Sequence, residues 1–167
     1  MSALAKLKET NAEASQWRRH IHAHPETAFE EFKTSDYVAN LLTSWGVEIH
    51  RGMAKTAVVG VIKGKTNISN RAIGLRADLD ALNILEETNV THCSKHEGKM
   101  HACGHDGHTA MLLAATRYLA ETRNFDGTVY AIFQPAEEGG GGGNVMVQEG
   151  FFKKFPCEAV FGMHNWP

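Results

Sequence analysis

A nearly continuous apolar run at residues 128–133 (TVYAIF) constrains the fold of this chain more than any other segment. Strands that are buried on both faces of a sheet are typically continuous apolar runs, whereas half-exposed strands alternate apolar and polar residues. Residues 108–122, which precede this run, have the apolar spacing of a strong amphipathic helix. Its apolar stripe consists of Met111, Leu112, Ala115, Tyr118 and Leu119.

Helical and strand-like patterns alternate along the rest of the chain. Further helices are predicted at residues 3–22, 34–45 and 144–149. Further strands are predicted at residues 47–50, 56–63, 71–76 and 159–163. This alternation predicts an α/β fold, a three-layer sandwich with a mixed, largely parallel sheet. No helix pattern follows the buried-looking strand at 159–163, so we expect a longer parent protein.

Charge and composition exclude several classes of protein. Seventeen Lys and Arg against nineteen Asp and Glu give a net charge of −2, so no basic surface for nucleic acid is expected. The apolar runs are shorter than the roughly 20 residues that a membrane-spanning helix needs. Three cysteines without a C-x-x-C pair and the lack of an apolar leader predict a reducing, cytoplasmic location. Ten histidines instead indicate metal or acid–base chemistry.

The histidine-rich segment at residues 101–108 (HACGHDGH) lies just before the predicted helix at 108–122. In an extended loop, Cys103 and His105 point the same way and can reach one metal ion. The helix dipole and a nearby cation would stabilise a thiolate at Cys103. The alternative is a buried cysteine among solvated histidines.

Polar residues also follow three predicted strands: Asp78 and Asp80, Glu137 and Glu138, and His164. Ligands and catalytic groups gather at the carboxyl ends of strands in open α/β sheets. Adjacent carboxylates in an extended chain face opposite ways, so one glutamate can bind a metal while the other stays free as a base. The alternatives are turn-forming aspartates, a solvated acidic pair and a structural histidine.

Several other catalytic motifs are missing from the sequence. It contains no H-E-x-x-H helix, no nucleotide-binding G-x-x-x-x-G-K-[ST] or G-x-G-x-x-G motif, and no G-x-S-x-G motif. A thiol protease that used Cys103 would leave Glu137, Glu138 and His164 without a role. Metal-dependent hydrolysis accounts for more of these residues.

Five stretches, spread over nearly the whole chain, resemble the metallo-amidohydrolase branch of the aminoacylase and carboxypeptidase-like dinuclear metallopeptidase superfamily. They are RRHIHAHPETAFEE (18–31), GLRADLDAL (74–82), KMHACGHDGHTAMLL (99–113), FQPAEEGGGGG (133–143) and FGMHNWP (161–167). One departure is Asn83, where the family usually has proline. His20, His22 and His24 lie in the first stretch without the spacing of ligands, and we expect a structural role for them.

The resemblance implies a zinc-peptidase-like fold with a site for two divalent ions. Its metal ligands would be Cys103, His105, Glu138 and His164, and Glu137 would be the general base. Asp78, Asp80 and His108 would lie in the outer shell; the two aspartates fall where the wider superfamily has a ligand histidine and its orienting aspartate. Zinc or manganese is the first expectation, with nickel or cobalt as alternatives, because mixed S, N and O ligands do not select one metal.

The same resemblance implies hydrolysis of the amide bond of small-molecule N-acyl amino acids by a metal-activated water. Family members are roughly twice as long, with an inserted domain for dimerisation and a later part that supplies a further histidine ligand. We therefore expect residues 1–167 to be the N-terminal portion of the catalytic domain of a homodimer, weakly active or inactive alone. A non-catalytic metal-binding fragment and a dipeptidase of the same superfamily are the alternatives.

Overall fold

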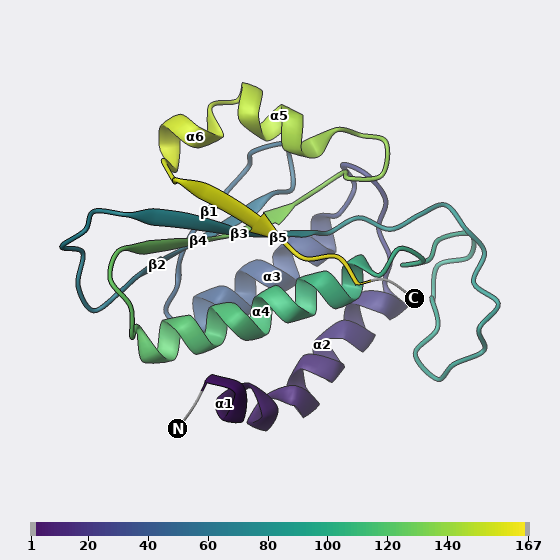
Figure 1. Ribbon diagram of the computed structural model, residues 1–167. Helices are drawn as coiled ribbons and strands as arrows, with labels where there is room; N and C mark the ends of the chain where they lie inside the picture. Colours follow the sequence, from purple (N-terminus) through teal and green to yellow (C-terminus); the bar gives the residue numbers. More distant parts are fainter. Residues whose placement is uncertain (1–2, 166–167) are drawn as a thin grey trace.

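The computed structural model describes residues 3–165 and has a five-stranded sheet at its centre (Figure 1). The strands lie in the order β1-β2-β4-β3-β5. They are β1 Glu48–Arg51, β2 Val58–Lys63, β3 Ala72–Asp78, β4 Thr128–Gln134 and β5 Ala159–Gly162. The predicted α/β fold and mixed sheet are confirmed.

Both parallel and antiparallel pairs occur in the sheet. β2 pairs antiparallel with β1 and β4, while β3 pairs parallel with β4 and β5. In the β3–β4 register Asp78 lies opposite Gln134. The carboxyl ends of β3, β4 and β5 therefore meet at one edge of the sheet.

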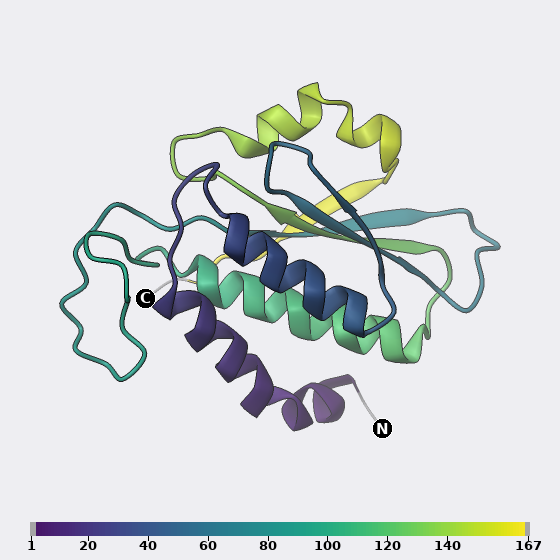
Figure 2. The same cartoon turned by 180° about the vertical axis from the view of Figure 1, so that it is seen from behind.

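Helices cover the two faces of the sheet unequally (Figures 1 and 2). One face carries α3 (Phe32–Ser44) and the long α4 (His105–Thr122), with α1 (Ala3–Glu9) and α2 (Asn11–Ala23) outside α4. The other face carries the short helices α5 (Gly142–Gln148) and α6 (Phe151–Lys154). Three layers result, as predicted.

β4 separates two apolar clusters and is buried on both faces. Phe133 is fully buried against Val38, Leu42 and Leu113 in the cluster between the sheet and α3–α4. Ile132, the next residue back along the strand, faces the cluster under α5 and α6. This double burial explains why residues 128–133 contain no charged residue.

Some predicted elements differ from the structure in extent or burial. The helix predicted at residues 3–22 is divided at Thr10, whose hydroxyl donates to the Leu7 carbonyl and helps to end α1. A buried strand was the prediction for 159–163; β5 is instead an exposed edge strand that pairs only with β3 among the described strands. α6 has no counterpart among the predicted helices. Within residues 3–165, no helix is long and apolar enough to cross a membrane.

Candidate metal centre

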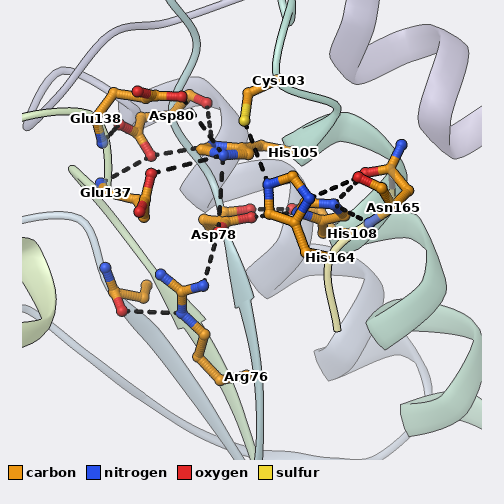
Figure 3. Close-up of polar contacts among 12 residues, drawn as sticks. Arg76, Asp78, Asp80, Cys103, His105, His108, Glu137, Glu138, His164 and Asn165 are labelled. Carbon is orange, nitrogen blue, oxygen red and sulfur yellow. Dashed lines mark hydrogen bonds and ion pairs between the residues drawn. The ribbon is translucent and has the colours of Figure 1, made fainter. Parts of the chain in front are cut away.

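The predicted site residues meet at the carboxyl edge of β3, β4 and β5, beside the N-terminus of α4 (Figure 3). Asp78 ends β3, and Asp80 lies two residues beyond it. Glu137 and Glu138 follow β4, and His164 follows β5. Cys103 precedes α4, whose first turn carries His105 and His108. The remaining residues of the 161–167 stretch, 166 and 167, lie outside the described part of the chain.

His105 is the residue that all parts of this site share. Its side chain is 1% exposed, and its Nδ1 donates to the backbone carbonyl of Asp80 at 2.8 Å. Its Nε2 is buried without a hydrogen-bond partner among residues 3–165. A donating Nδ1 leaves Nε2 as a lone pair, the usual arrangement of a metal-binding histidine.

Carboxylate oxygens surround that lone pair at distances too long for hydrogen bonds. The Nε2 atom lies 3.7 Å from Asp78 Oδ2, 3.8 Å from Glu137 Oε2 and 3.8 Å from Glu138 Oε1. The buried ring nitrogen lacks a hydrogen-bond donor within residues 3–165, and the carboxylates around it carry an excess of negative charge. A cation between them would satisfy both. The residues present therefore fit a divalent ion.

Within residues 3–165, three groups of side chains could each hold a metal ion, and every group contains His105. They are Cys103, His105 and His164; Asp78, His105 and His108; and His105, Glu137 and Glu138. Within each group the ligand atoms lie within 4.8 Å of one another. The ligand atoms of these groups approach His105 from different segments of the chain. Their mixed thiol, imidazole and carboxylate donors suit a transition metal.

Cys103 is half-buried, with its Sγ 3.4 Å from His164 Nε2. Burial raises the pKa of the Cys103 thiol to about 11, and the carboxylate of Glu138 adds to the rise. The helix dipole by itself therefore does not produce a thiolate, because burial and nearby carboxylates raise the pKa of the thiol. Ionisation of this thiol at neutral pH requires a cation beside the sulfur.

Glu137 and Glu138 both point toward His105, whereas an extended chain would have directed them to opposite sides (Figure 3). Ala136 has a φ of 53°, so the backbone turns just before the pair. Their N–H groups both donate to the Asp80 carboxylate, from Glu137 at 3.0 Å and from Glu138 at 2.8 Å. The two glutamates differ in exposure: 44% for the Glu137 side chain and 27% for Glu138.

His108 has partners on both ring nitrogens. Its Nδ1 donates to Asp78 Oδ1 at 2.7 Å, and its Nε2 accepts from the backbone N–H of Asn165 at 3.0 Å. A Cβ on Gly104, whose φ is 88°, would lie 2.6 Å from the Asn165 amide, so a side chain there would displace the 164–165 segment. His108 therefore orients Asp78 and the end of the chain that carries His164.

Sequence reasoning missed three residues that support the site: Arg76, Asn165 and Glu31. Arg76 donates to Asp78 Oδ2 at 2.7 Å; two-residue alternation along β3 places both side chains on one face and would have indicated this pair. Glu31 reaches the backbone of the site from a segment far away in the chain, and no local pattern predicts such a contact.

The histidines of the first family-like stretch do not join the centre. His22 is buried, with Nδ1 2.9 Å from Asp106 and Nε2 3.1 Å from Glu86. His20 stacks on Tyr37, and His24 Nδ1 donates to the His20 carbonyl.

The chain is similar in sequence to a family of peptidases and to two enzymes that are named for amide hydrolysis. The model of peptidase family M20/M25/M40 matches residues 74–167. A hippurate hydrolase of Campylobacter jejuni is 47% identical over all 167 residues, which cover 43% of that protein. An N-acetyl-L-cysteine deacetylase of Bacillus subtilis is 43% identical over 90% of the chain and 35% of its own length.

The fold is also similar to that of a solved structure. The YXEP protein of Bacillus subtilis, described as a dinuclear metal binding peptidase, is 40% identical with a TM-score of 0.89. The match covers 96% of this chain and 44% of that one. The chain thus spans less than half the length of the relatives that it matches.

Proposed function

Because the chain belongs to peptidase family M20/M25/M40, we propose that it carries the metal centre of an enzyme that hydrolyses the amide bond of N-acyl amino acids. The observation that carries this proposal is the buried, unpartnered Nε2 of His105, with three carboxylate oxygens within 3.8 Å. A purely structural histidine would have a hydrogen-bond partner at that position.

Cys103, His105, Glu138 and His164 would hold two divalent ions, with Asp78, Asp80 and His108 behind them. Zinc or manganese is our first assignment, and nickel or cobalt also fits this donor set. When bound, such ions polarise the amide carbonyl and lower the pKa of water.

Glu137 would act as the base. Its carboxylate is the more exposed of the glutamate pair, yet it faces the same point as Glu138. It would take a proton from the attacking water and pass it to the departing amine, as a general base and then a general acid. Asp80 would keep this carboxylate in place through the N–H of Glu137.

Substrate and context are proposed from the relatives. The names hippurate hydrolase and N-acetyl-L-cysteine deacetylase favour small N-acyl amino acids, rather than nucleic acid or a membrane, as the partner of a cytoplasmic enzyme. We propose that residues 1–167 form the N-terminal portion of the catalytic domain, since the first of these relatives is covered for 43% of its length. The rest of a longer parent would add a dimerisation domain and further site residues.

Two substitutions test the division of roles. Glu137→Gln should keep the bound metal and lower hydrolysis of hippurate or N-acetyl-methionine by the longer protein about 10²- to 10⁴-fold. Cys103→Ala should instead lose metal, as measured by elemental analysis after gel filtration. Glu97→Gln, an exposed glutamate on the 83–100 loop, is the matched control and should change neither.

A Glu137→Gln protein with undiminished turnover would show that another group is the base. Wild-type protein that holds metal without turnover would favour the alternative of a non-catalytic metal-binding fragment. The chain covers 43% of the length of the hippurate hydrolase, so this alternative applies to residues 1–167 in particular.

A further inference from the structure

A buried carboxylate outside the metal groups contacts the backbone of the site. Glu31, just before α3, is fully buried. Its Oε1 accepts from the N–H of Ala136 at 2.9 Å and from the N–H of Phe29 at 3.0 Å. Its Oε2 accepts from the Thr56 hydroxyl at 2.6 Å. Three donors from three segments offset part of the cost of burying this carboxylate, although burial still raises its pKa.

The two backbone donors share an unusual conformation. Phe29 has a φ of 60° and Ala136 a φ of 53°, both in the left-handed region that residues with a Cβ seldom adopt. Such strain persists only where surrounding contacts impose it, and it concentrates at functional sites. Here one carboxylate oxygen holds both strained N–H groups.

The strained residue Ala136 immediately precedes the glutamate pair. Its N–H is held by Glu31, and the next two N–H groups, of Glu137 and Glu138, are held by Asp80. Two carboxylates thus fix three consecutive peptide groups. The turn is packed tightly, because a Cβ on Gly140 would lie 2.7 Å from the Ala136 Cβ.

We propose that Glu31 is a positioning residue that keeps Ala136 left-handed and thereby turns both Glu137 and Glu138 toward His105. The φ of Ala136 sets the direction in which the chain leaves β4, so an extended Ala136 would carry both glutamates away from their positions beside His105. The inference rests on the proposed function, because it assigns Glu31 to the placement of that centre's base and ligand.

A merely structural role for Glu31 predicts a different outcome. The carboxylate also ties together the segments of Phe29 and Thr56, so its loss would lower stability in either case. A structural residue would do so without changing the affinity of the folded protein for metal. A positioning residue changes that affinity and the spectrum of the bound ion.

Glu31→Gln is the test, with Co²⁺ as the probe. The Thr56 hydroxyl can rotate to accept from the new amide, so the change chiefly removes the charge that holds the two strained N–H groups. We expect the Co²⁺ affinity of folded protein to fall about tenfold or more, as for other outer-shell partners. The visible absorption of bound Co²⁺ should shift as well.

Glu26→Gln is the matched control. Glu26 also accepts backbone N–H groups, from Lys33 at 3.2 Å and Thr34 at 2.8 Å, but it braces α3 rather than the glutamate turn. It should lower the midpoint of thermal unfolding and leave the Co²⁺ affinity and spectrum unchanged. Equal effects of both variants on Co²⁺ would overturn the inference.

Ala136→Gly supplies an independent arm, since glycine adopts positive φ without the steric cost. In the Glu31→Gln background it should restore part of the lost Co²⁺ affinity, although it cannot restore the hydrogen bonds. No recovery in a folded double variant would contradict the proposed link through backbone conformation.

The experiment separates this inference from the proposed function. Wild-type protein that fails to bind Co²⁺ would refute the metal centre itself, whereas wild-type binding with an unaffected Glu31→Gln variant would refute only the role of Glu31. If Glu31→Gln does not fold, Thr56→Val removes one of the three donors; a smaller loss of Co²⁺ affinity supports the inference, and none overturns it.

Discussion

The charges of individual residues explain why this centre needs a cation. Asp78, Asp80, Glu137 and Glu138 lie around His105, while Arg76 is the cation that contacts this group, at 2.7 Å from Asp78. Four carboxylates against one guanidinium leave an excess of negative charge, and partial burial strengthens its field. Divalent ions bound among these side chains would offset that repulsion.

Asp80 contacts the site through both its side chain and its backbone, so its substitution should affect both stability and metal binding. Its carboxylate accepts the N–H groups of Glu137 and Glu138, and its backbone carbonyl accepts from His105 Nδ1. Asp80→Asn would turn an amide donor toward one of the two N–H groups. We expect a loss of about 1–3 kcal/mol in the free energy of unfolding, together with a 10- to 100-fold weaker metal affinity by chelator competition.

Asp126→Asn is the control for this substitution. Asp126 likewise accepts two backbone N–H groups, from Ile68 and Ser69, at the opposite edge of the fold. It should affect stability alone. A metal affinity that falls equally in the two variants would show that general loosening of the fold, and not Asp80, sets the affinity.

At the scale of whole elements, the sequence pattern predicted where a helix or strand lies better than it predicted how deeply that element is buried. The apolar stripe predicted a helix at 108–122, but α4 begins three residues earlier. The pattern missed this first turn because His105, Asp106 and Gly107 stand there in place of apolar residues. β5 has the same apolar composition as a buried strand and is an edge strand. Its neighbours, and not its own residues, decide its exposure.

The segment that carries Cys103 and His105 is held on both sides by one histidine of α2. His22 bridges Asp106 in the first turn of α4 and Glu86 in the 83–100 loop. Because each ring nitrogen faces a carboxylate, the two contacts favour the protonated imidazolium form, in which both nitrogens donate. Glu86 in turn accepts the N–H of Ser94, so the bridge also organises the loop that leads to Cys103.

This bridge predicts a pH dependence of stability in chelator-treated protein. The hydrogen bond to Asp106 raises the pKa of His22 above its usual 6.5; burial opposes the rise, and Glu86 adds to it. A raised folded-state pKa contributes stability that is fully present below 6.5 and is lost as the pH rises through the folded value. The stabilisation relative to His22→Gln should therefore be largest below pH 6.5 and shrink as the pH rises above it in urea unfolding.

The other groups around His22 define the control for that experiment. His92 and His101 lie with ring centroids 5.5 and 6.3 Å away, and burial lowers the pKa of His101 to about 4. The charge of His22 lowers the pKa of both rings, so their titration also changes in the variant. His20→Gln, on the same helix, should give the opposite slope, since burial lowers the pKa of His20. A His22→Gln difference that is constant with pH would show that the ring is uncharged.

At the scale of the whole molecule, topology explains both what could be predicted and what could not. Sequence placed Asp78, Glu137 and His164 after strands, and parallel pairing of β3 with β4 and β5 brings those strand ends together. The orientation of the side chains depends on contacts between distant segments. Ala136 turns left-handed because of Glu31, which lies 105 positions earlier in the chain. No local propensity of alanine predicts that turn.

The exposed edge of the sheet predicts how the 167-residue chain behaves as a whole. Along β5 and just beyond it, Val160 is 42% exposed, Phe161 57% and Met163 64%. An apolar edge strand with unpaired backbone groups is a template for association with another chain. We expect concentration-dependent self-association in analytical ultracentrifugation, and Phe161→Lys should reduce it by placing a charge on the edge. Ile68→Lys changes an equally apolar, 89% exposed residue away from β5; an equal reduction by both variants would mean that the association depends on surface charge and not on the β5 edge.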